Sequence, residues 1–172
     1  MSTNSTQGRK LTRKGQTGFS LIELVVVIVI IAIIGAIAIP KMSRGSAGAG
    51  DSALTQDLSV MRSAVDLFNA EHPNATVSAT TIVNQLTEYS DITGATLSAT
   101  KNSTSIYGPY LRGSTLPALP AGSTNKGQTA ITTTAPGATA TANSGWYWDG
   151  TTFWANCPNS EQDVSGKAYN TY

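Results

Sequence analysis

The stretch KGQTGFSLIELVVVIVIIAIIGAIAIP, residues 14–40, joins a basic leader to a long apolar run and decides the fold. The run covers 21 residues from Phe19 to Ile39 and is interrupted only by Ser20 and Glu23. As a helix it would extend about 31 Å at about 1.5 Å per residue, which matches the hydrocarbon core of a bilayer. We therefore expect a membrane-length helix that carries one carboxylate near its start.

The leader supplies charge of one sign. Arg9, Lys10, Arg13 and Lys14 precede the run, and no acid lies among the first 18 residues. By the positive-inside rule, the N-terminus stays cytoplasmic and the rest of the chain lies across the membrane. Without residues 1–18 the chain keeps 7 of its 11 bases against 10 acids, a net charge of −3. Such a chain has no basic stripe for phosphates, which argues against nucleic acid as a partner.

Three interpretations of the apolar run are open at this point. The first is a simple signal anchor. The second is a secretory signal peptide, because Ala36-Ile37-Ala38 offers an A-x-A cleavage site after the apolar stretch. The third places the cut between Gly18 and Phe19, which keeps the run in the mature protein.

Glu23 discriminates among these interpretations. A carboxylate inside a bilayer costs a few kcal/mol, and a generic anchor has no use for it. Ser20 and Glu23 fit the S-x-x-E capping box, and negative charge at that place suits the helix dipole. If the chain is cut after Gly18, Phe19 also carries a new amine with a pKa near 8, four positions before Glu23. The two roles are compatible, and the residues alone leave both open.

The segment GFSLIEL at residues 18–24, with a basic leader before it and Pro40 after the run, resembles the N-terminal signature of type IV pilins and pseudopilins. The resemblance implies that a prepilin peptidase cuts after Gly18 and methylates the new N-terminus at Phe19. It also implies that Glu23 contacts the N-terminal amine of a neighbouring subunit during assembly.

The same resemblance implies a domain organisation. Residues 1–18 would be a cleaved leader, residues 19–39 a transmembrane and filament-core helix, and residues 40–172 a periplasmic globular domain. The subunit would be a single-pass protein of the bacterial inner membrane before it enters a periplasmic filament. Its implied partners are further copies of itself, minor pseudopilins, the prepilin peptidase and the inner-membrane assembly platform. The resemblance implies no enzymatic activity and no cofactor.

The residues after the run predict how the first helix continues. Gly35 and Pro40 predict a kink or a melted turn, and an ordinary helix end at Ile39 is the alternative. Three glycines in residues 43–50 predict a weak joint. Beyond it, apolar residues at spacings of three and four predict a helix with one core-facing stripe: Leu54, Leu58, Met61, Val65 and Phe68. His72, before Pro73, is expected to be a solvated residue at the helix end.

Shorter elements follow along the chain. Residues 81–89 predict a second helix, residues 90–94 a turn, and residues 129–134 a strand within an otherwise mobile loop at 121–145. WYW at 146–148 and FWA at 153–155 flank an Asp-Gly turn and predict a β-hairpin. Alternation sends Trp146 and Trp148 to one face, where we expect them to pack on the first helix.

Chemical sites are scarce in this sequence. One histidine and one cysteine exclude a Cys/His zinc constellation, and Cys157 is expected to be a buried small residue. Some pseudopilins bind calcium near the C-terminus, so Asp149, Glu161 and Asp163 are the candidates, although their spacing reproduces no recognised calcium loop. With one cysteine the chain lacks the C-terminal disulfide common in type IVa pilins, which favours a pseudopilin.

The predicted fold class is α+β and pilin-like: a long N-terminal helix, transmembrane and then amphipathic, packed on a small antiparallel β-sheet. The expected function is that of a structural subunit in the pseudopilus of a type II secretion system, a filament that aids export of folded proteins. YGPYL at residues 107–111 and the second helix resemble stretches of major pseudopilins. The alternatives are a subunit of a type IV pilus for adhesion, motility or DNA uptake, and an anchored domain whose tryptophans bind carbohydrate.

Overall fold

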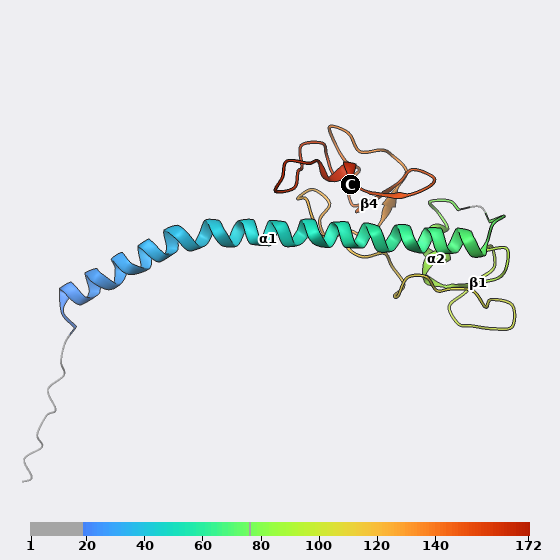
Figure 1. Cartoon of the computed structure of the whole chain (residues 1–172), viewed down its shortest axis with the longest axis horizontal. Coiled ribbons are helices and arrows are strands. Elements are labelled where there is room, and N and C mark those ends of the chain that lie inside the picture. The colour runs from blue at the N-terminus through green and yellow to red at the C-terminus, as the bar shows by residue number, and fades with distance from the viewer. Residues whose placement is uncertain (1–18, 76) are drawn as a thin grey trace, which may run out of the picture. The chain divides into compact units, whose positions relative to one another are not determined.

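The computed structural model describes residues 19–75 and 77–172, and the side chains of residues 37–47 lie outside the description. Its elements follow in this order (Figure 1): α1 (Leu21–Glu71), α2 (Ile82–Thr87), β1 (Tyr89–Ser90), β2 (Leu97–Ser98), β3 (Ile131–Thr132), β4 (Trp146–Trp148), β5 (Phe153–Ala155) and a 3-10 helix η1 (Tyr169–Thr171). The chain divides into two units, Met1–Lys41 and Met42–Tyr172, and α1 contributes to both.

Helix α1 is continuous in its backbone from Leu21 to Glu71. It does not end at Ile39, and the turn before Pro40 is not melted. The glycine-rich stretch at 43–50 is helical too, so the weak joint expected there does not interrupt the helix. The kink expected at Gly35 and Pro40 stays a prediction, because the side chain of Pro40 lies outside the described residues.

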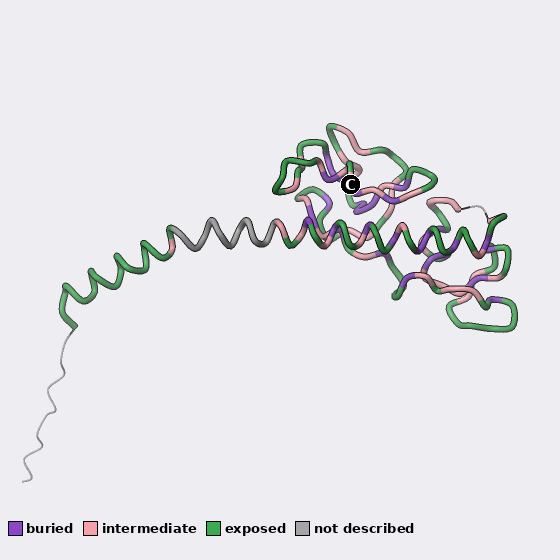
Figure 2. The backbone as a smooth tube through the Cα atoms, in the orientation of Figure 1, coloured by how far each residue is buried: buried purple, intermediate pink, exposed green. Residues whose placement is uncertain are grey.

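The part of α1 in the second unit carries the predicted core stripe. Leu54, Leu58, Met61, Val65 and Phe68 are each at most 3% exposed, which confirms the helical spacing read from the sequence. The rest of the core comes from α1 itself, α2, η1, the strands and the loops: Ala64, Ile82, Leu86, Leu111, Leu116, Leu119, Ala121, Trp146, Trp148, Phe153, Ala155, Cys157 and Tyr169. In Figure 2 the described turns of α1 in the second unit accordingly alternate between the buried and exposed colours.

The end of α1 corrects one expectation. The helix stops at Glu71 as predicted, but the side chain of His72 is only 2% exposed and is not solvated. Its ring stacks on Phe68 with centroids 4.4 Å apart. Its two nitrogens lie 2.9 Å from the Phe68 carbonyl oxygen and 2.8 Å from the Asp91 carbonyl oxygen. The turn at Asp91 folds back over the helix end, so His72 is a hydrogen-bonded core residue.

Two small sheets complete the second unit. Strands β1 and β2 pair antiparallel, as do β4 and β5, but β3 pairs parallel with β4. The larger sheet is therefore mixed, with the strand order β3-β4-β5, instead of purely antiparallel. Residues 133–145 allow this pairing, because a connection of about a dozen residues is long enough to bring the chain back beside its own start.

The hairpin of β4 and β5 follows the predicted alternation. Trp146, Trp148, Phe153 and Ala155 face the core and are at most 3% exposed. The ring centroids of Trp148 and Phe153 lie 4.9 Å apart. Both residues belong to the same buried cluster as the stripe of α1, so the aromatic residues pack over α1 as expected. The second helix also forms, at Ile82–Thr87 within the predicted range.

Two buried asparagines hold the irregular segment 121–145 in place. The Nδ2 of Asn125 donates to the carbonyl oxygens of Thr141 at 2.9 Å and Asn156 at 2.8 Å. The Nδ2 of Asn156 donates to the same Thr141 oxygen at 2.8 Å and to that of Ser144 at 2.7 Å. The segment lacks regular structure outside β3, but these four bonds tie its end to the hairpin.

The architecture confirms the predicted class. A long N-terminal helix carries small β-sheets and loops on its second part, which makes an α+β protein consistent with a pilin-like fold. Within the described residues, no helix combines the length and the apolar character that crossing a membrane requires.

Candidate functional site at the start of helix α1

The first turn of α1 is capped by a side chain of its own. Glu23 Oε2 accepts a hydrogen bond of 3.1 Å from the backbone N–H of Ser20. The Ser20 carbonyl oxygen accepts from the N–H of Leu24 at 3.3 Å, which places Ser20 at the N-cap. Glu23 therefore stands at the third helical position and reaches back, which is one half of the predicted capping box. In this part of the chain the structure gives no bond from the Ser20 hydroxyl for the other half.

The cap leaves part of the Glu23 carboxylate unused. Glu23 is exposed, and within the described residues Oε1 has no hydrogen-bond partner. A carboxylate offers about four lone-pair positions, so one bond to Ser20 does not saturate it. Capping in its own chain and contact with a cation from outside are therefore compatible.

Phe19 lies immediately before the capped turn and is 85% exposed. Gly18, the other side of the expected cleavage point, lies outside the described residues. A carboxylate at the first turn also interacts favourably with the positive end of the helix dipole. Phe19, on the C-terminal side of the expected cleavage point, is therefore accessible. The nearest charged side chain, the Glu23 carboxylate, can only accept hydrogen bonds.

The helix that follows exposes an unbroken apolar surface. Every large apolar side chain from Phe19 to Ile34 is at least 39% exposed: Phe19, Leu21, Ile22, Leu24, Val25, Val26, Val27, Ile28, Val29, Ile30, Ile31, Ile33 and Ile34. Figure 2 shows these turns almost entirely in the colour of exposed residues. A soluble monomer rarely leaves such a surface uncovered, so this helix requires lipid or protein around it.

Comparison with known proteins bears on this helix. A family model described as the prokaryotic N-terminal methylation motif matches residues 13–39. The chain carries a type IV pilin-like signal. This motif contains Phe19, Glu23 and Gly35, and it extends beyond Ala36 to residues 37–39, whose side chains lie outside the described part. No curated protein and no solved structure shows a significant match to the chain.

Glycine at position 35 lies inside α1. A Cβ placed on it would meet no atom within 4 Å, so no packing within the described chain explains the glycine. Its surroundings are open in the same way as those of the apolar side chains before it.

The three acids considered for calcium do not converge in the structure. No group of three or more His, Cys, Asp or Glu side chains suited to a metal occurs within the described residues. Glu161 accepts from the N–H and the hydroxyl of both Ser123 and Thr124 at 2.6–2.9 Å. Partial burial raises the pKa of Glu161, but these bonds outweigh it and lower the pKa to about 2.

Asp149 and Asp163 are held in the same manner. Asp149 accepts from the N–H groups of Thr151 and Thr152 and from the indole N–H of Trp154, each at 2.8 Å. Partial burial raises its pKa, but these bonds outweigh burial and lower it to about 2. Bonds from the Tyr172 hydroxyl and from Ser165 lower the pKa of Asp163. Asp149 and Asp163 accept from N–H and O–H donors of their own loops, and Glu161 accepts from donors of the distant Ser123 and Thr124, whereas calcium requires converging oxygen ligands.

Cys157 is fully buried, as expected for a small core residue. Burial raises the pKa of its thiol to about 12, and the neighbouring Glu161 carboxylate adds to the effect. A thiol with this pKa is protonated at neutral pH and is a poor nucleophile. This residue has a packing role.

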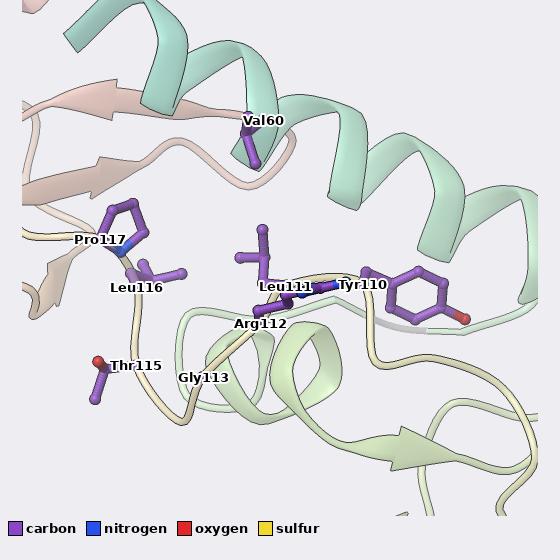
Figure 3. A pocket seen from close by; sticks show the side chains of 8 residues that line it. All are labelled: Val60, Tyr110, Leu111, Arg112, Gly113, Thr115, Leu116 and Pro117. Atoms are coloured by element: carbon purple, nitrogen blue, oxygen red, sulfur yellow. The ribbon is translucent and has the colours of Figure 1, made fainter. Parts of the chain in front are cut away.

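One open groove in the second unit was not foreseen from the sequence. It encloses about 550 Å³ between Val60 of α1 and the segment 110–117. Figure 3 shows Leu111 and Val60 pointing toward each other across it. The segment is fixed at one end, because the N–H groups of Tyr110 and Leu111 both donate to the Leu86 carbonyl oxygen. Tyr110 and Leu111 therefore cap the end of α2, while Tyr107 pairs with Ser90.

Sequence reasoning also missed Arg62, which joins α1 to β5 and to the C-terminal segment. Arg62 donates to the Phe153 carbonyl oxygen at 2.8 and 3.1 Å and to the Tyr172 carbonyl oxygen at 2.5 Å. Its guanidinium lies 5.0 Å from the ring centre of Trp154. A polar residue in the middle of an amphipathic helix was the only signal, and it did not indicate which carbonyl groups would accept.

Proposed function

We propose that the chain is a pseudopilin of the major type, a structural subunit of a type II secretion pseudopilus. In this proposal a prepilin peptidase removes residues 1–18 and methylates Phe19. Residues 19–39 then anchor the subunit in the inner membrane, with the globular part in the periplasm. Subunits polymerise with minor pseudopilins on an inner-membrane platform into a filament that aids export of folded proteins. The role is structural and requires no catalytic residue.

One observation carries this proposal: the methylation motif leads into α1, and every large apolar side chain of the helix from Leu21 to Ile34 is exposed. Lipid covers such a surface before assembly, and neighbouring helices cover it in a filament, so the same side chains serve both states. A secretory signal peptide would be discarded after cleavage. A simple anchor would not need Glu23 at its first turn.

A subunit of a type IV pilus is the second candidate. It would carry the same N-terminal motif and the same exposed helix. The single cysteine favours a pseudopilin, because a disulfide-closed C-terminal loop cannot form within the chain. Deletion of the gene distinguishes the two candidates. If the chain is a pseudopilin, the deletion is expected to stop export of a folded secreted enzyme and to leave twitching motility unchanged. Loss of motility with normal export would favour the pilus.

Mass analysis of the N-terminus tests the proposal directly. The mature protein, purified from membranes of the native host, is expected to begin with N-methylated Phe19. A host without prepilin peptidase is the matched control and is expected to keep residues 1–18. A mature protein that begins at Ile39 would identify a secretory signal peptide. An intact Met1 in the native host would identify a simple anchor, and either result would overturn the proposal.

A further inference from the structure

The outward face of the hairpin presents two aromatic side chains that the core does not use. Tyr147 and Trp154 lie directly opposite each other in the register of β4 and β5, and both are partly exposed. Directly opposed residues of an antiparallel pair have Cβ atoms about 4.5–5.5 Å apart. The two rings are therefore neighbours on the surface. The other two tryptophans, Trp146 and Trp148, face the core and are inaccessible.

Trp154 is held in a fixed orientation. Its indole N–H donates to Asp149 Oδ2 at 2.8 Å, and the Arg62 guanidinium lies 5.0 Å from its ring centre. Arg62 is itself anchored on the Phe153 carbonyl oxygen. A ligand that contacts this ring would not have to immobilise it first, which is the advantage of a preorganised site.

A cavity of about 300 Å³ includes both rings in its wall. Its lining consists of Ala135, Pro136, Tyr147, Asp149, Trp154 and Asn170. The volume is at the lower end of the range for small-molecule sites, which are about 300–1,000 Å³. Pro136 and Ala135 add apolar surface, so the cavity suits a ligand with one flat apolar face.

The charged group of the lining is the Asp149 carboxylate, which is a hydrogen-bond acceptor only. The Asp149 carboxylate is ionised at neutral pH, because its pKa is about 2. Within the described residues, Asp149 Oδ2 accepts only from the Trp154 indole N–H, so it keeps a lone pair for a ligand donor. The Oδ1 of Asn170 is buried and out of reach of a ligand. None of the six lining residues is basic. The ligand should therefore bring donors and no negative charge.

We propose that this cavity binds a neutral hexopyranose unit of a polysaccharide. The C–H face of the sugar ring stacks on Tyr147 and Trp154, because the face of an aromatic ring is electron-rich. A sugar hydroxyl donates to Asp149 Oδ2. A uronic acid is rejected by the Asp149 carboxylate. The site lies within one subunit, so it does not rest on the proposed role in a filament.

The test is a titration of the full chain by NMR, with cellohexaose as the neutral probe and hexagalacturonate as the anionic probe. The protein is kept in micelles of lauryldimethylamine oxide, because detergents with sugar headgroups would compete for the cavity. The indole N–H signal of Trp154, assigned by its loss in Trp154→Phe, is expected to shift in a saturable way with cellohexaose. The signal of the buried Trp146 is expected to stay in place.

Two variants complete the test. Tyr147→Ala removes one ring of the pair, and its hydroxyl has no hydrogen-bond partner within the described residues, so the fold should be kept. It is expected to weaken cellohexaose binding about tenfold. Ile92→Ala, at a residue 60% exposed and outside the cavity, is the control and should bind like the wild type. An absent or unsaturable shift, equal binding by Tyr147→Ala, or a preference for hexagalacturonate would overturn the proposal.

Discussion

The Asp51 carboxylate accepts a hydrogen bond of 2.7 Å from the Tyr169 hydroxyl, a residue 118 positions later in the chain. Its second oxygen accepts from the N–H of Val164 at 3.1 Å. Asp51 is 9% exposed, so both bonds are shielded from water. They join the C-terminal segment to α1 at a position three residues before the core residue Leu54.

Tyr169→Phe tests this link. The variant leaves the Asp51 oxygen without one of its partners, and we expect it to lower the free energy of unfolding by about 1–3 kcal/mol. Burial and the bond to Asp51 raise the pKa of Tyr169. Its protonated form is thus favoured in the folded state, so the contribution is complete below the ordinary pKa of about 10 and is lost as the pH rises above it.

Urea unfolding of the full chain in micelles at pH 7 and above pH 10 measures both effects. Tyr89→Phe is the matched control, because the Tyr89 hydroxyl has no partner within the described residues. Equal stability of Tyr169→Phe and wild type at pH 7 would contradict the link.

Leu58→Ala and Leu67→Ala form a matched pair on α1. Leu58 is 1% exposed and Leu67 is 51% exposed. We expect the first substitution to destabilise the second unit by about 2–5 kcal/mol, because it removes a buried side chain and leaves a cavity. The second should cost less than about 1 kcal/mol. Thermal unfolding followed by tryptophan fluorescence measures the difference, and similar losses from both would contradict the assignment of the core face.

Glu23→Ala and Glu23→Gln separate the two roles of this carboxylate. Glutamine keeps an oxygen that can accept from the Ser20 N–H, whereas alanine loses the cap and the charge. If charge on a neighbouring amine drives assembly, both variants are expected to insert, to be cleaved and to fail to form filaments. Electron microscopy of sheared filaments and N-terminal mass analysis provide the two measurements. Normal filaments from Glu23→Ala would contradict a contact between Glu23 and a neighbouring subunit. Normal filaments from Glu23→Gln but not from Glu23→Ala would show that Glu23 acts by capping its own helix.

The folded state should become less stable in acid, because protonation of Glu161 removes the contribution of its carboxylate. The pKa of Glu161 is lowered from its ordinary value of 4.5 to about 2, so its contribution is present above 4.5 and is lost as the pH falls toward 2. We expect Glu161→Gln to have a lower Tm than wild type at pH 7, with a difference that narrows between pH 4.5 and 2. Glu88→Gln is the control, since the Glu88 carboxylate has no partner among the described residues. A difference in Tm that stays constant between pH 4.5 and 2 would contradict the stabilising role of the bonds that Glu161 accepts.

Calcium is expected to leave the Tm unchanged. The carboxylates of Asp149 and Glu161 already accept from several N–H and O–H groups. Within the described residues, neither of them belongs to a group of three or more potential metal ligands. Thermal unfolding with millimolar calcium chloride or with a chelator measures this, and magnesium chloride controls for ionic strength. A rise in Tm specific to calcium would reinstate a calcium site at these acids.

Periodic elements could be predicted from the sequence, because periodicity is a local signal. The spacing from Leu54 to Phe68 identified the core stripe, and alternation placed Trp146 and Trp148 on the inner face. The S-x-x-E pattern identified the cap that Glu23 forms. In each case the physical cause lies within a few residues of the pattern.

Long-range contacts could not be predicted in this way. The burial of His72 depends on the Asp91 turn, and the pairing of Asp51 with Tyr169 depends on where the C-terminal segment returns. The parallel pairing of β3 depends on the path of residues 133–145. The acceptors of Asn125 and Asn156 are backbone carbonyl groups. Every residue has such a group, so the sequence does not indicate which ones accept.

The burial of Cys157 makes the chain a ready-made background for labelling. Its thiol is the only one in the sequence, it is shielded from solvent, and its pKa is about 12, so maleimides at neutral pH should leave it unmodified. A cysteine introduced at an exposed position such as Val164 or Ile92 would be the one reactive handle on each subunit. Spin labels or crosslinkers at such handles could measure spacings between neighbouring copies without first removing the native residue.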